Sequence, residues 1–209
     1  MRKCTKPSQY SYLIMNKPCG YVCSAASDSH KTVYELLTPE LQKMVNGAPR
    51  GCRLHTVGRL DCDTSGLLLL TNDGKFSHMI STGSNTGVCK TYRAILKNPV
   101  TPEDQKSYIS RASAGLILPA EKKYAKQKAL PASIIFESSN VCTITVLEGK
   151  FHEVRRIFRA LGNEVLNLER IAIGSLTLPE NLKPGQWREM AEEEKNSVCY
   201  AELFSASNQ

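Results

Sequence analysis

The sequence contains no long apolar segment. Its longest unbroken apolar run is the leucine run Leu67–Leu70, whereas a membrane-spanning helix needs about 20 consecutive apolar residues. The residues from Met1 to Pro7 contain no apolar stretch that resembles a secretory signal. We therefore expect no membrane span and a cytoplasmic protein.

The sequence also lacks the residue spacings that metals and nucleotide cofactors require. None of the 8 cysteines forms a CxxC pair, and neither GxGxxG nor GxxxxGK occurs. The 4 histidines are scattered along the chain. We predict no metal and no cofactor, with reduced cysteines in small buried or loop positions.

Positive charge is the main compositional feature that is present. The chain has 27 Lys and Arg against 20 Asp and Glu, a formal net charge of +7 and a pI near 9.0. Such a surface favours a polyanion such as RNA or DNA, although many basic proteins bind neither. Its 209 residues suffice for one domain or two small lobes.

Several segments carry the patterns of strands or helices. Strands are predicted at 10–15 (YSYLIM), at 67–71 before the turn signal Asn72-Asp73-Gly74, and at 141–147 (VCTITVL). Helices are predicted at 32–41, after the capping residue Thr101, and at 152–161. Elements of both kinds mix without regular alternation, which indicates an α+β fold with a mostly antiparallel sheet.

Two of these segments are rich in basic residues. Helix 152–161 has one apolar stripe (Val154, Ile157, Phe158 and Leu161), with Gly162 as its stop signal, and its arginines lie outside that stripe. Residues 121–128 (EKKYAKQK) are basic as well, and a solvated loop is favoured there over a specific RNA contact.

The segment from Gly58 to Gly74, GRLDCDTSGLLLLTNDG, places Asp61 and Arg59 just before a buried strand. Two interpretations are open from the residues alone. A carboxylate at the edge of a buried strand is held rigidly, as a catalytic group must be. Alternatively, Asp61, Asp63 and their neighbours form a turn by bonding their own backbone. The residues alone favour the turn.

The same segment closely resembles the signature of the RsuA-type family of rRNA pseudouridine synthases. Three further segments match that family in order: Asn16–Ser24 (NKPCGYVCS), Lys90-Thr91-Tyr92, and Glu148–Val165 (EGKFHEVRRIFRALGNEV) continued by Leu168–Leu178. The similarity covers roughly residues 10–194. It implies a bent antiparallel sheet in two lobes with a basic active-site cleft between them, and it favours the 16S rRNA enzyme over its 23S relatives.

The resemblance also implies roles for single residues. Asp61 would attack or deprotonate the target nucleotide, Tyr92 would stack on the flipped uracil, and Arg155 would pair with Asp61. RNA or substrate contacts are expected from Arg59, Lys17, Lys90 and Arg156, with Lys17 supporting the site. Asp63 is the rival to Asp61, because residues two apart in a strand share a face. Packing for Tyr92 and a solvated helix face for Arg155 are the structural alternatives.

The expected function is the isomerisation of a uridine in ribosomal RNA to pseudouridine, which needs no redox carrier, ATP or metal. The alternative is a non-catalytic RNA-binding or ribosome-assembly protein on the same fold; a base-excision glycosylase lacks support, because no helix–hairpin–helix pattern is seen. We expect a monomer that acts on ribosomal RNA or an assembly intermediate.

The expected organisation is a flexible arm at 1–9, a catalytic domain at 10–195 and a tail at 196–209. Only about fifteen residues precede Asn16. We therefore expect the N-terminal RNA-binding module of many family members to be absent here, in a naturally short protein or an incomplete N-terminus.

Overall fold

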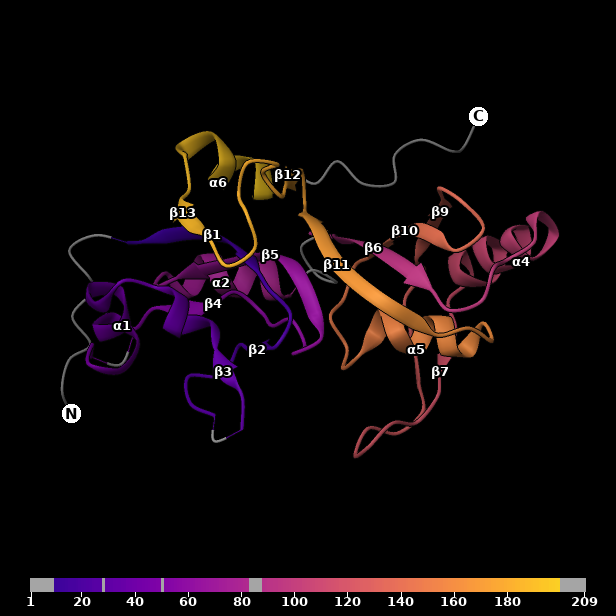
Figure 1. Ribbon diagram of the computed structural model, residues 1–209, viewed down its shortest axis with the longest axis horizontal. Helices are drawn as coiled ribbons and strands as arrows, with labels where there is room; N and C mark the ends of the chain where they lie inside the picture. Colours follow the sequence, from indigo (N-terminus) through magenta and orange to yellow (C-terminus); the bar gives the residue numbers. More distant parts are fainter. Residues whose placement is uncertain (1–9, 28, 50, 83–87, 200–209) are drawn as a thin grey trace.

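A computed structural model describes residues 10–27, 29–49, 51–82 and 88–199. A large mixed sheet runs through both halves of the molecule, in the strand order β13-β1-β5-β11-β6-β10-β9, with β12 on β11 and β4 on β5 (Figure 1). Its strands are β1 (Tyr12–Lys17), β4 (His55–Thr56), β5 (Thr64–Thr71), β6 (Lys90–Leu96), β9 (Ser133–Phe136), β10 (Val141–Val146), β11 (Val165–Ile173), β12 (Leu176–Thr177) and β13 (Trp187–Glu189). The α+β class and the mostly antiparallel sheet are confirmed.

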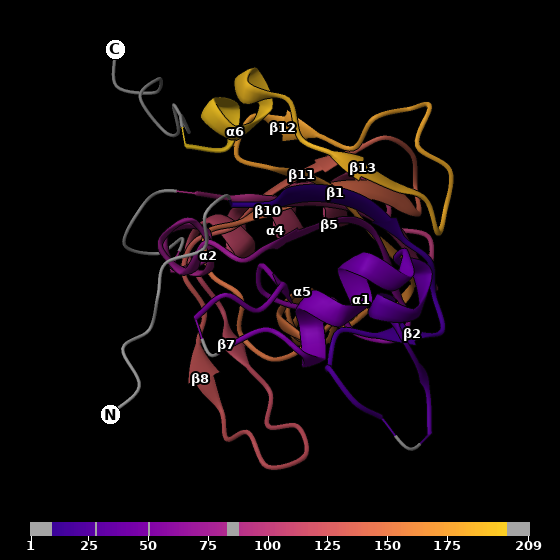
Figure 2. The ribbon, with the colours of Figure 1, turned by 90° about the vertical axis from the view of Figure 1, so that its left-hand side faces the viewer.

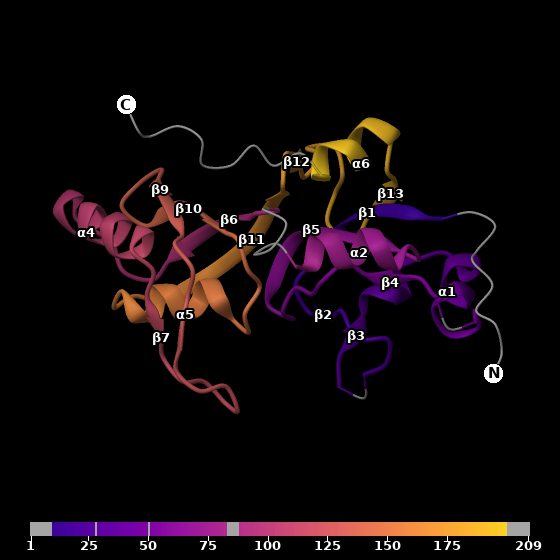
Figure 3. The same cartoon turned by 180° about the vertical axis from the view of Figure 1, so that it is seen from behind.

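Short strands and helices flank this sheet. The small strand pairs are β2 (Tyr21–Val22) with β3 (Lys31–Thr32), and β7 (Ile117–Leu118) with β8 (Gln127–Lys128). The helical elements are η1 (Val33–Leu36), α1 (Pro39–Asn46), α2 (Gly74–Ser81), α4 (Pro102–Ser113), α5 (Glu153–Ala160) and α6 (Glu192–Cys199). Both the β7–β8 hairpin and the β2–β3 segment project from the same side of the molecule, one from each half (Figures 1 and 3).

The two halves meet where β5 pairs with β11. This pairing is parallel and short, joining Thr64–Gly66 to Leu168–Arg170, whereas the other strand pairs of the large sheet in the described residues are antiparallel. Gly66 allows the close approach: its φ is +100°, and a Cβ there would lie 2.3 Å from the carbonyl oxygen of Arg170. The sequence that carries Asp61 therefore leads directly into the junction of the halves.

The leucine run of β5 is buried on both faces of the sheet. Leu68 and Leu70 pack into one core with residues of β1 and η1, while Leu67 and Leu69 pack into another that includes Ile80 of α2. Successive strand residues point to opposite faces, so a strand covered on both sides needs an unbroken apolar run. This burial fixes the position of the strand that follows Asp61.

Several sequence predictions are confirmed by the observed elements. The predicted strands correspond to β1, β5 and β10, and Thr101 caps α4 by accepting a hydrogen bond from the Asp104 N–H (3.2 Å). The apolar stripe of α5 is buried in the core of the C-terminal half, and Gly162 follows the helix with a φ of +91°.

One prediction of local structure needs correction, and two others gain detail. The predicted helix 32–41 is split into η1 and α1, because Leu37 is extended and Pro39 disfavours a helical Thr38. The signal Asn72-Asp73-Gly74 opens α2, whose first N–H groups bond the Asp73 carboxylate. The basic segment 121–128 carries the tip of the β7–β8 hairpin, with Glu121 bridged to Tyr124.

The expected C-terminal boundary falls inside helix α6. This helix crosses position 195, and Val198 is fully buried, so the packed domain includes the helix. The expected arm at 1–9 and the residues after 199 lie outside the described residues. No helix within the described ranges has the length and apolar character needed to cross a membrane.

Candidate active site

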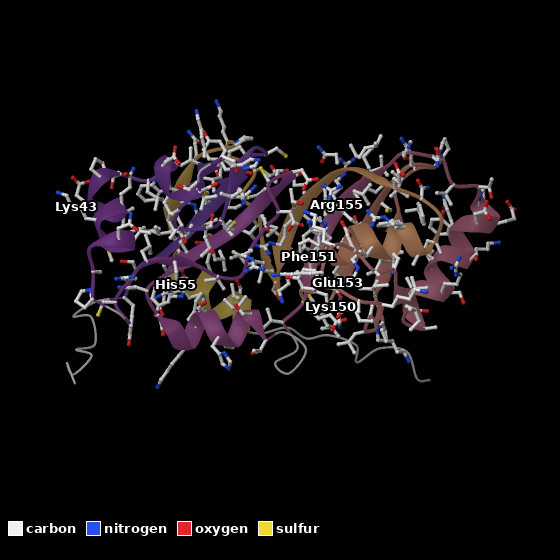
Figure 4. All side chains as sticks on the ribbon, turned by 90° about the horizontal axis from the view of Figure 1, so that it is seen from below. Lys43, His55, Lys150, Phe151, Glu153 and Arg155 are labelled. Carbon is white, nitrogen blue, oxygen red and sulfur yellow. The ribbon has the colours of Figure 1, made fainter. Side chains whose placement is uncertain are left out.

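A cleft of about 410 Å³ lies at the junction of the two halves. Its walls come from the loop before β5, from β6 and β11, from the start of α5, and from the β7–β8 hairpin. Its charged and aromatic lining residues are Arg59, Asp61, Lys90, Tyr92, Tyr124, Lys150, Phe151, His152, Glu153, Arg155 and Arg170. Figure 4 shows Lys150, Phe151, Glu153 and Arg155 gathered at the middle of the molecule.

Asp61 lies on the turn that precedes β5, as one of the two sequence interpretations required, and its side chain also lines the cleft. The side chain is 37% exposed. The turn is held by Lys17, whose ammonium donates to the backbone carbonyls of Asp61 (3.0 Å) and Thr64 (2.7 Å). Turn and catalytic placement are therefore compatible, because the turn is what presents the carboxylate.

Lys17 supports the site as expected but does not reach RNA. Its side chain is fully buried and its donors are used on backbone carbonyls. Burial also lowers the pKa of its ammonium group. The expectation of an RNA contact from Lys17 is therefore wrong, and its role is to fix the Asp61 turn.

Arg155 pairs with Asp63 instead of Asp61. One of its terminal nitrogens lies 2.9 Å from the Asp63 carboxylate and also donates to the Asp63 carbonyl at 3.1 Å. The other donates to the carbonyl of Val165 at 2.8 Å. The predicted Arg155–Asp61 pair is thus absent; Arg155 fastens the turn beside Asp61 to the start of β11. Asp63 itself points outward, with 67% of its side chain exposed.

Tyr92 lies on β6 and packs against the cores of both halves while it lines the cleft. Burial raises the pKa of its hydroxyl, although Arg170 acts in the opposite direction through charge and a hydrogen bond. The structure thus combines the two interpretations of Tyr92, packing and a position at the site.

Two buried cations in the cleft have unused hydrogen-bond donors. The Lys90 ammonium and one terminal nitrogen of Arg170 have no partner among the described residues, and each residue is less than a tenth exposed. Burial, reinforced by the charge of Arg170, lowers the pKa of Lys90. Arg170 was missed from the sequence, although it lies in the matched segment Leu168–Leu178, because nothing in β-strand periodicity marks one arginine as a site residue.

Arg156 and Arg59 differ in their access to solvent. Arg156 is fully buried and donates to the carbonyls of Pro119 (2.9 Å) and Ala125 (3.1 Å), so it ties α5 to the β7–β8 hairpin. The expected RNA contact from Arg156 is therefore wrong. Arg59 is exposed at the cleft, where an RNA contact is sterically open.

His152 is the second residue that sequence reasoning left without a role. Its Nε2 lies 3.6 Å from the Asp61 carboxylate and its Nδ1 lies 2.9 Å from Glu121. His55, which also borders a matched motif, lies on the N-terminal half away from the labelled cleft residues (Figure 4). Spacing alone could not separate these two histidines, because the fold decides which one reaches Asp61.

A buried pair of glutamates lies beside this group. Burial and the neighbouring Glu148 raise the pKa of Glu153 to about 8. Glu148 forms an ion pair with Lys150. Burial is the largest single influence on Glu148 and would raise its pKa, but its hydrogen bonds with Lys150, the Leu130 N–H and Glu153, together with the charge of Lys150, lower it. The surroundings therefore favour the protonated form at Glu153 and the ionised form at Glu148.

Comparisons with known proteins match both the sequence and the fold. Residues 11–160 match the family model described as RNA pseudouridylate synthase. Ribosomal small subunit pseudouridine synthase A of Salmonella typhimurium is 39% identical over 187 residues, covering 90% of this chain and 73% of the relative. The protein of the same name from Escherichia coli K12 is 38% identical over the same coverage.

Solved structures also match this chain. A crystal structure of a pseudouridylate synthase superposes with a TM-score of 0.77 at 34% identity, covering 91% of this chain and 74% of that one. A Cbf5–Nop10–Gar1 complex matches with a TM-score of 0.55 at 17% identity, which is a likeness of fold.

Proposed function

The chain belongs to the RNA pseudouridylate synthase family, and on that premise we propose that it converts a uridine of small-subunit (16S) ribosomal RNA to pseudouridine. The observation that carries the proposal is the cleft at the junction of the halves. It presents Asp61, Tyr92 and two buried cations with unused donors to one space. The substrate class follows from the relatives, which are named as small-subunit enzymes.

The reaction needs one carboxylate next to the sugar. The bond between N1 of uracil and C1′ of ribose breaks, a bond between C5 and C1′ forms, C5 loses its proton and N1 gains one. Asp61 would act either as the nucleophile at C1′ or as the base that takes a sugar proton. Both routes require an ionised carboxylate in a fixed position, and Lys17 and Arg155 fix the turn that supplies it.

The detached uracil needs a site in which it can turn without leaving. A uridine must first leave its stack, which costs about a few kcal/mol. The ring of Tyr92 would stack on the extruded base, while Lys90 and Arg170 would donate their unused hydrogens to its carbonyl oxygens. A non-catalytic RNA-binding protein would have no need for unpaired cations buried in this position, because each costs free energy until a ligand meets it.

The partner and compartment follow from the proposed substrate. Ribosomal RNA, free or in an assembly intermediate, would meet the exposed Arg59 at the cleft, and the protein would work in the cytoplasm as a monomer.

The test is tritium release from RNA labelled at C5 of uridine. Each isomerisation expels the C5 hydrogen to water, so the purified protein should release tritium from small-subunit rRNA or its assembly intermediates. Binding without release would contradict the proposal and favour the non-catalytic alternative.

Two matched variants test which aspartate supplies the carboxylate that the reaction needs. Asp61→Asn should abolish release while RNA affinity stays within a few-fold, since it changes charge but little volume. Asp63→Asn should retain release and lose some stability, because its carboxylate contacts only Arg155 among the ion pairs found. A dead Asp63→Asn with an active Asp61→Asn would reverse the assignment.

A further inference from the structure

His152 lies between two carboxylates on opposite edges of its imidazole ring. Nδ1 is 2.9 Å from Oε1 of Glu121, and Nε2 is 3.6 Å from Oδ1 of Asp61. The side chain is 20% exposed, so the ring is partly shielded from water. Glu121 in turn accepts a hydrogen bond from Arg159, about two helical turns after His152, at 3.1 Å.

The ring is fixed in this position by backbone and packing. His152 has a φ of +47°, in the left-handed region that is uncommon for residues other than Gly, although Asn, Asp and His adopt it more often than the rest. Its imidazole stacks on Phe151 with centroids 3.8 Å apart, and Phe151 stacks on Tyr124 at 4.3 Å. A residue held in an uncommon conformation by its surroundings is typical of functional sites.

The hydrogen-bond partners of the His152 ring indicate which of its nitrogens carry protons. An ionised Glu121 can only accept, so Nδ1 carries a proton and donates it. Burial is the largest single influence on Glu121 and would raise its pKa, but the hydrogen bonds and charge interactions with His152 and Arg159 together outweigh it. The pKa is therefore lowered, which favours the ionised carboxylate. If Nε2 also carries a proton, it faces Asp61 with a donor; without that proton, two lone pairs would oppose one another.

We propose that His152, as an imidazolium, is a positioning residue that holds the Asp61 carboxylate against the target nucleotide, and that Glu121 holds the imidazole. This inference rests on the proposed function of the cleft. The 3.6 Å separation is longer than a hydrogen bond and closes by a small rotation of the carboxylate, as contacts in unliganded sites do.

Glu121 connects His152 to the β7–β8 hairpin. Glu121 belongs to the tip of the β7–β8 hairpin, next to Lys122 and Lys123, and Figure 2 shows that the hairpin projects away from the sheet. An RNA backbone held by these lysines would therefore be linked through Glu121 and His152 to the catalytic carboxylate.

Other charged groups surround this arrangement and contribute to its pH dependence. Lys122 lies over the Phe151 ring, 5.7 Å from its centroid. The remaining titratable and charged side chains in the cleft are Arg59, Lys90, Tyr92, Tyr124, Lys150, Glu153, Arg155 and Arg170. Of these, Glu153 titrates near neutral pH, since its pKa is about 8, and the experiment must separate it from His152.

The test compares single-turnover tritium release across pH for wild type, His152→Asn and Glu121→Gln. Asparagine tolerates the left-handed backbone, so His152→Asn should fold normally. It should lower the rate by about tenfold to a hundredfold, the scale of a misplaced catalytic group. The wild-type rate should fall with rising pH as the imidazolium loses its proton, and this limb should vanish in His152→Asn. Glu121→Gln should give a smaller loss of rate, because it removes the group that holds the imidazole but leaves the imidazole beside Asp61.

Two control variants test whether the change in rate and in its pH profile belongs to His152. His78→Gln, at an exposed histidine of α2, should change neither the rate nor its pH profile. Glu153→Gln should retain the alkaline limb, because that limb belongs to His152. A His152→Asn variant with the wild-type rate and an unchanged pH profile would overturn the inference while the activity itself stood. An inactive wild type would instead contradict the proposed function.

A second readout does not depend on activity. The ¹⁵N shifts of the His152 ring report how much of it is imidazolium in the unliganded protein. This fraction at neutral pH should fall in both Asp61→Asn and Glu121→Gln, because each removes a negative charge beside the ring. A ring that is neutral in the wild type, and unaffected by both substitutions, would overturn the inference.

Discussion

The acidic side chains around the cleft have different roles because their surroundings differ. Asp61 is partly exposed in the cleft and faces His152; Asp63 points outward and is tied to Arg155; Glu153 is buried. Charge on a carboxylate is favoured by water and by cations and opposed by burial. The same functional group can therefore serve as the proposed nucleophile or base at Asp61, as a structural anchor at Asp63, and as an acid whose protonated form is favoured at Glu153.

At Arg155, removal of the side chain should loosen the turn that carries Asp61. Arg155→Ala leaves the carbonyls of Val165 and Asp63 without this donor, at a cost of about 1–2 kcal/mol in unfolding free energy. The single-turnover rate should fall about tenfold because Asp61 is less well placed, and Arg155→Lys should recover part of it.

Arg93 provides the control for this prediction. It forms an exposed ion pair with Glu137 on the surface, and Arg93→Ala should cost at most about 1 kcal/mol and leave the rate unchanged. Denaturant unfolding and single-turnover tritium release measure the two effects. Equal, small effects of both alanine variants on the rate would contradict a role for Arg155 in placing Asp61.

At Glu153, the raised pKa predicts a loss of stability with rising pH. The folded protein keeps the Glu153 proton up to a pKa of about 8, while the unfolded chain releases it near the ordinary value of 4.5. Between these values the folded state binds more protons, so the free energy of unfolding falls as pH rises. The lowered pKa of Glu148 acts below about pH 4.5 and does not offset this trend.

Glu153→Gln should remove this dependence. The variant should gain stability over the wild type at pH 8 relative to pH 5, on the order of a few kcal/mol, as measured by urea unfolding at both values. Parallel pH dependences in the two proteins would show that Glu153 does not carry a buried proton.

Among the elements, the pairing of β5 with β11 is the feature on which the site depends most. Gly66 lies against Arg170 at this join, and the Asp61 turn precedes it. Gly66→Ala would place a methyl group 2.3 Å from a backbone oxygen and force φ values that alanine disfavours. We expect a loss of about 2–4 kcal/mol in unfolding free energy, the scale of strong packing defects, together with a lower rate.

Gly74→Ala is the matched control for Gly66→Ala. Gly74 begins α2, and a Cβ there meets no atom within 4 Å. Its substitution should leave both the melting temperature and the tritium-release rate near those of the wild type. If Gly66→Ala melts like Gly74→Ala, the close approach of the two strands is not required.

The elements that the sequence predicted well are those with a local physical cause. The α5 stripe, the Thr101 cap and the two-sided burial of β5 follow from neighbouring residues. The prediction of one helix over 32–41 overlooks the pattern Thr38-Pro39-Glu40. It repeats the Thr101-Pro102-Glu103 pattern that starts α4, so it is a usable signal for a helix start.

The site was less predictable because its contacts join distant parts of the chain. The pair of Arg155 with Asp63 spans 92 positions, and Arg156 is buried by the hairpin at 117–128 rather than by its own helix. Helix periodicity described Arg156 as lying off the apolar stripe, which was correct, but did not reveal what covers that face.

Across the whole molecule, the net charge of +7 overstates the basic surface that meets RNA. Lys17 and Arg156 are buried, and their side chains donate hydrogen bonds to backbone carbonyls inside the fold. Arg156→Ala should therefore unfold the protein at lower denaturant concentration by leaving carbonyls unpaired, while RNA affinity of the folded fraction is retained. A stable variant with weak RNA binding would restore the surface interpretation of Arg156.

The remaining exposed cations predict a steep salt dependence of RNA binding. Each phosphate contact releases counterions, so the logarithm of the affinity should fall linearly with the logarithm of the salt concentration. Arg59→Ala should make that slope shallower by about one contact, whereas Lys106→Ala, on the exposed face of α4 away from the lining residues, should not. A flat dependence would argue against RNA as the main partner.

The most direct test of the central claim is a map of pseudouridine in small-subunit ribosomal RNA from cells that lack this gene. One pseudouridine should disappear in these cells. The wild-type gene should restore it, whereas the Asp61→Asn gene, expressed at the same level, should not. Small-subunit RNA with an unchanged set of pseudouridines in the deleted strain, or restoration by Asp61→Asn, would contradict the central claim.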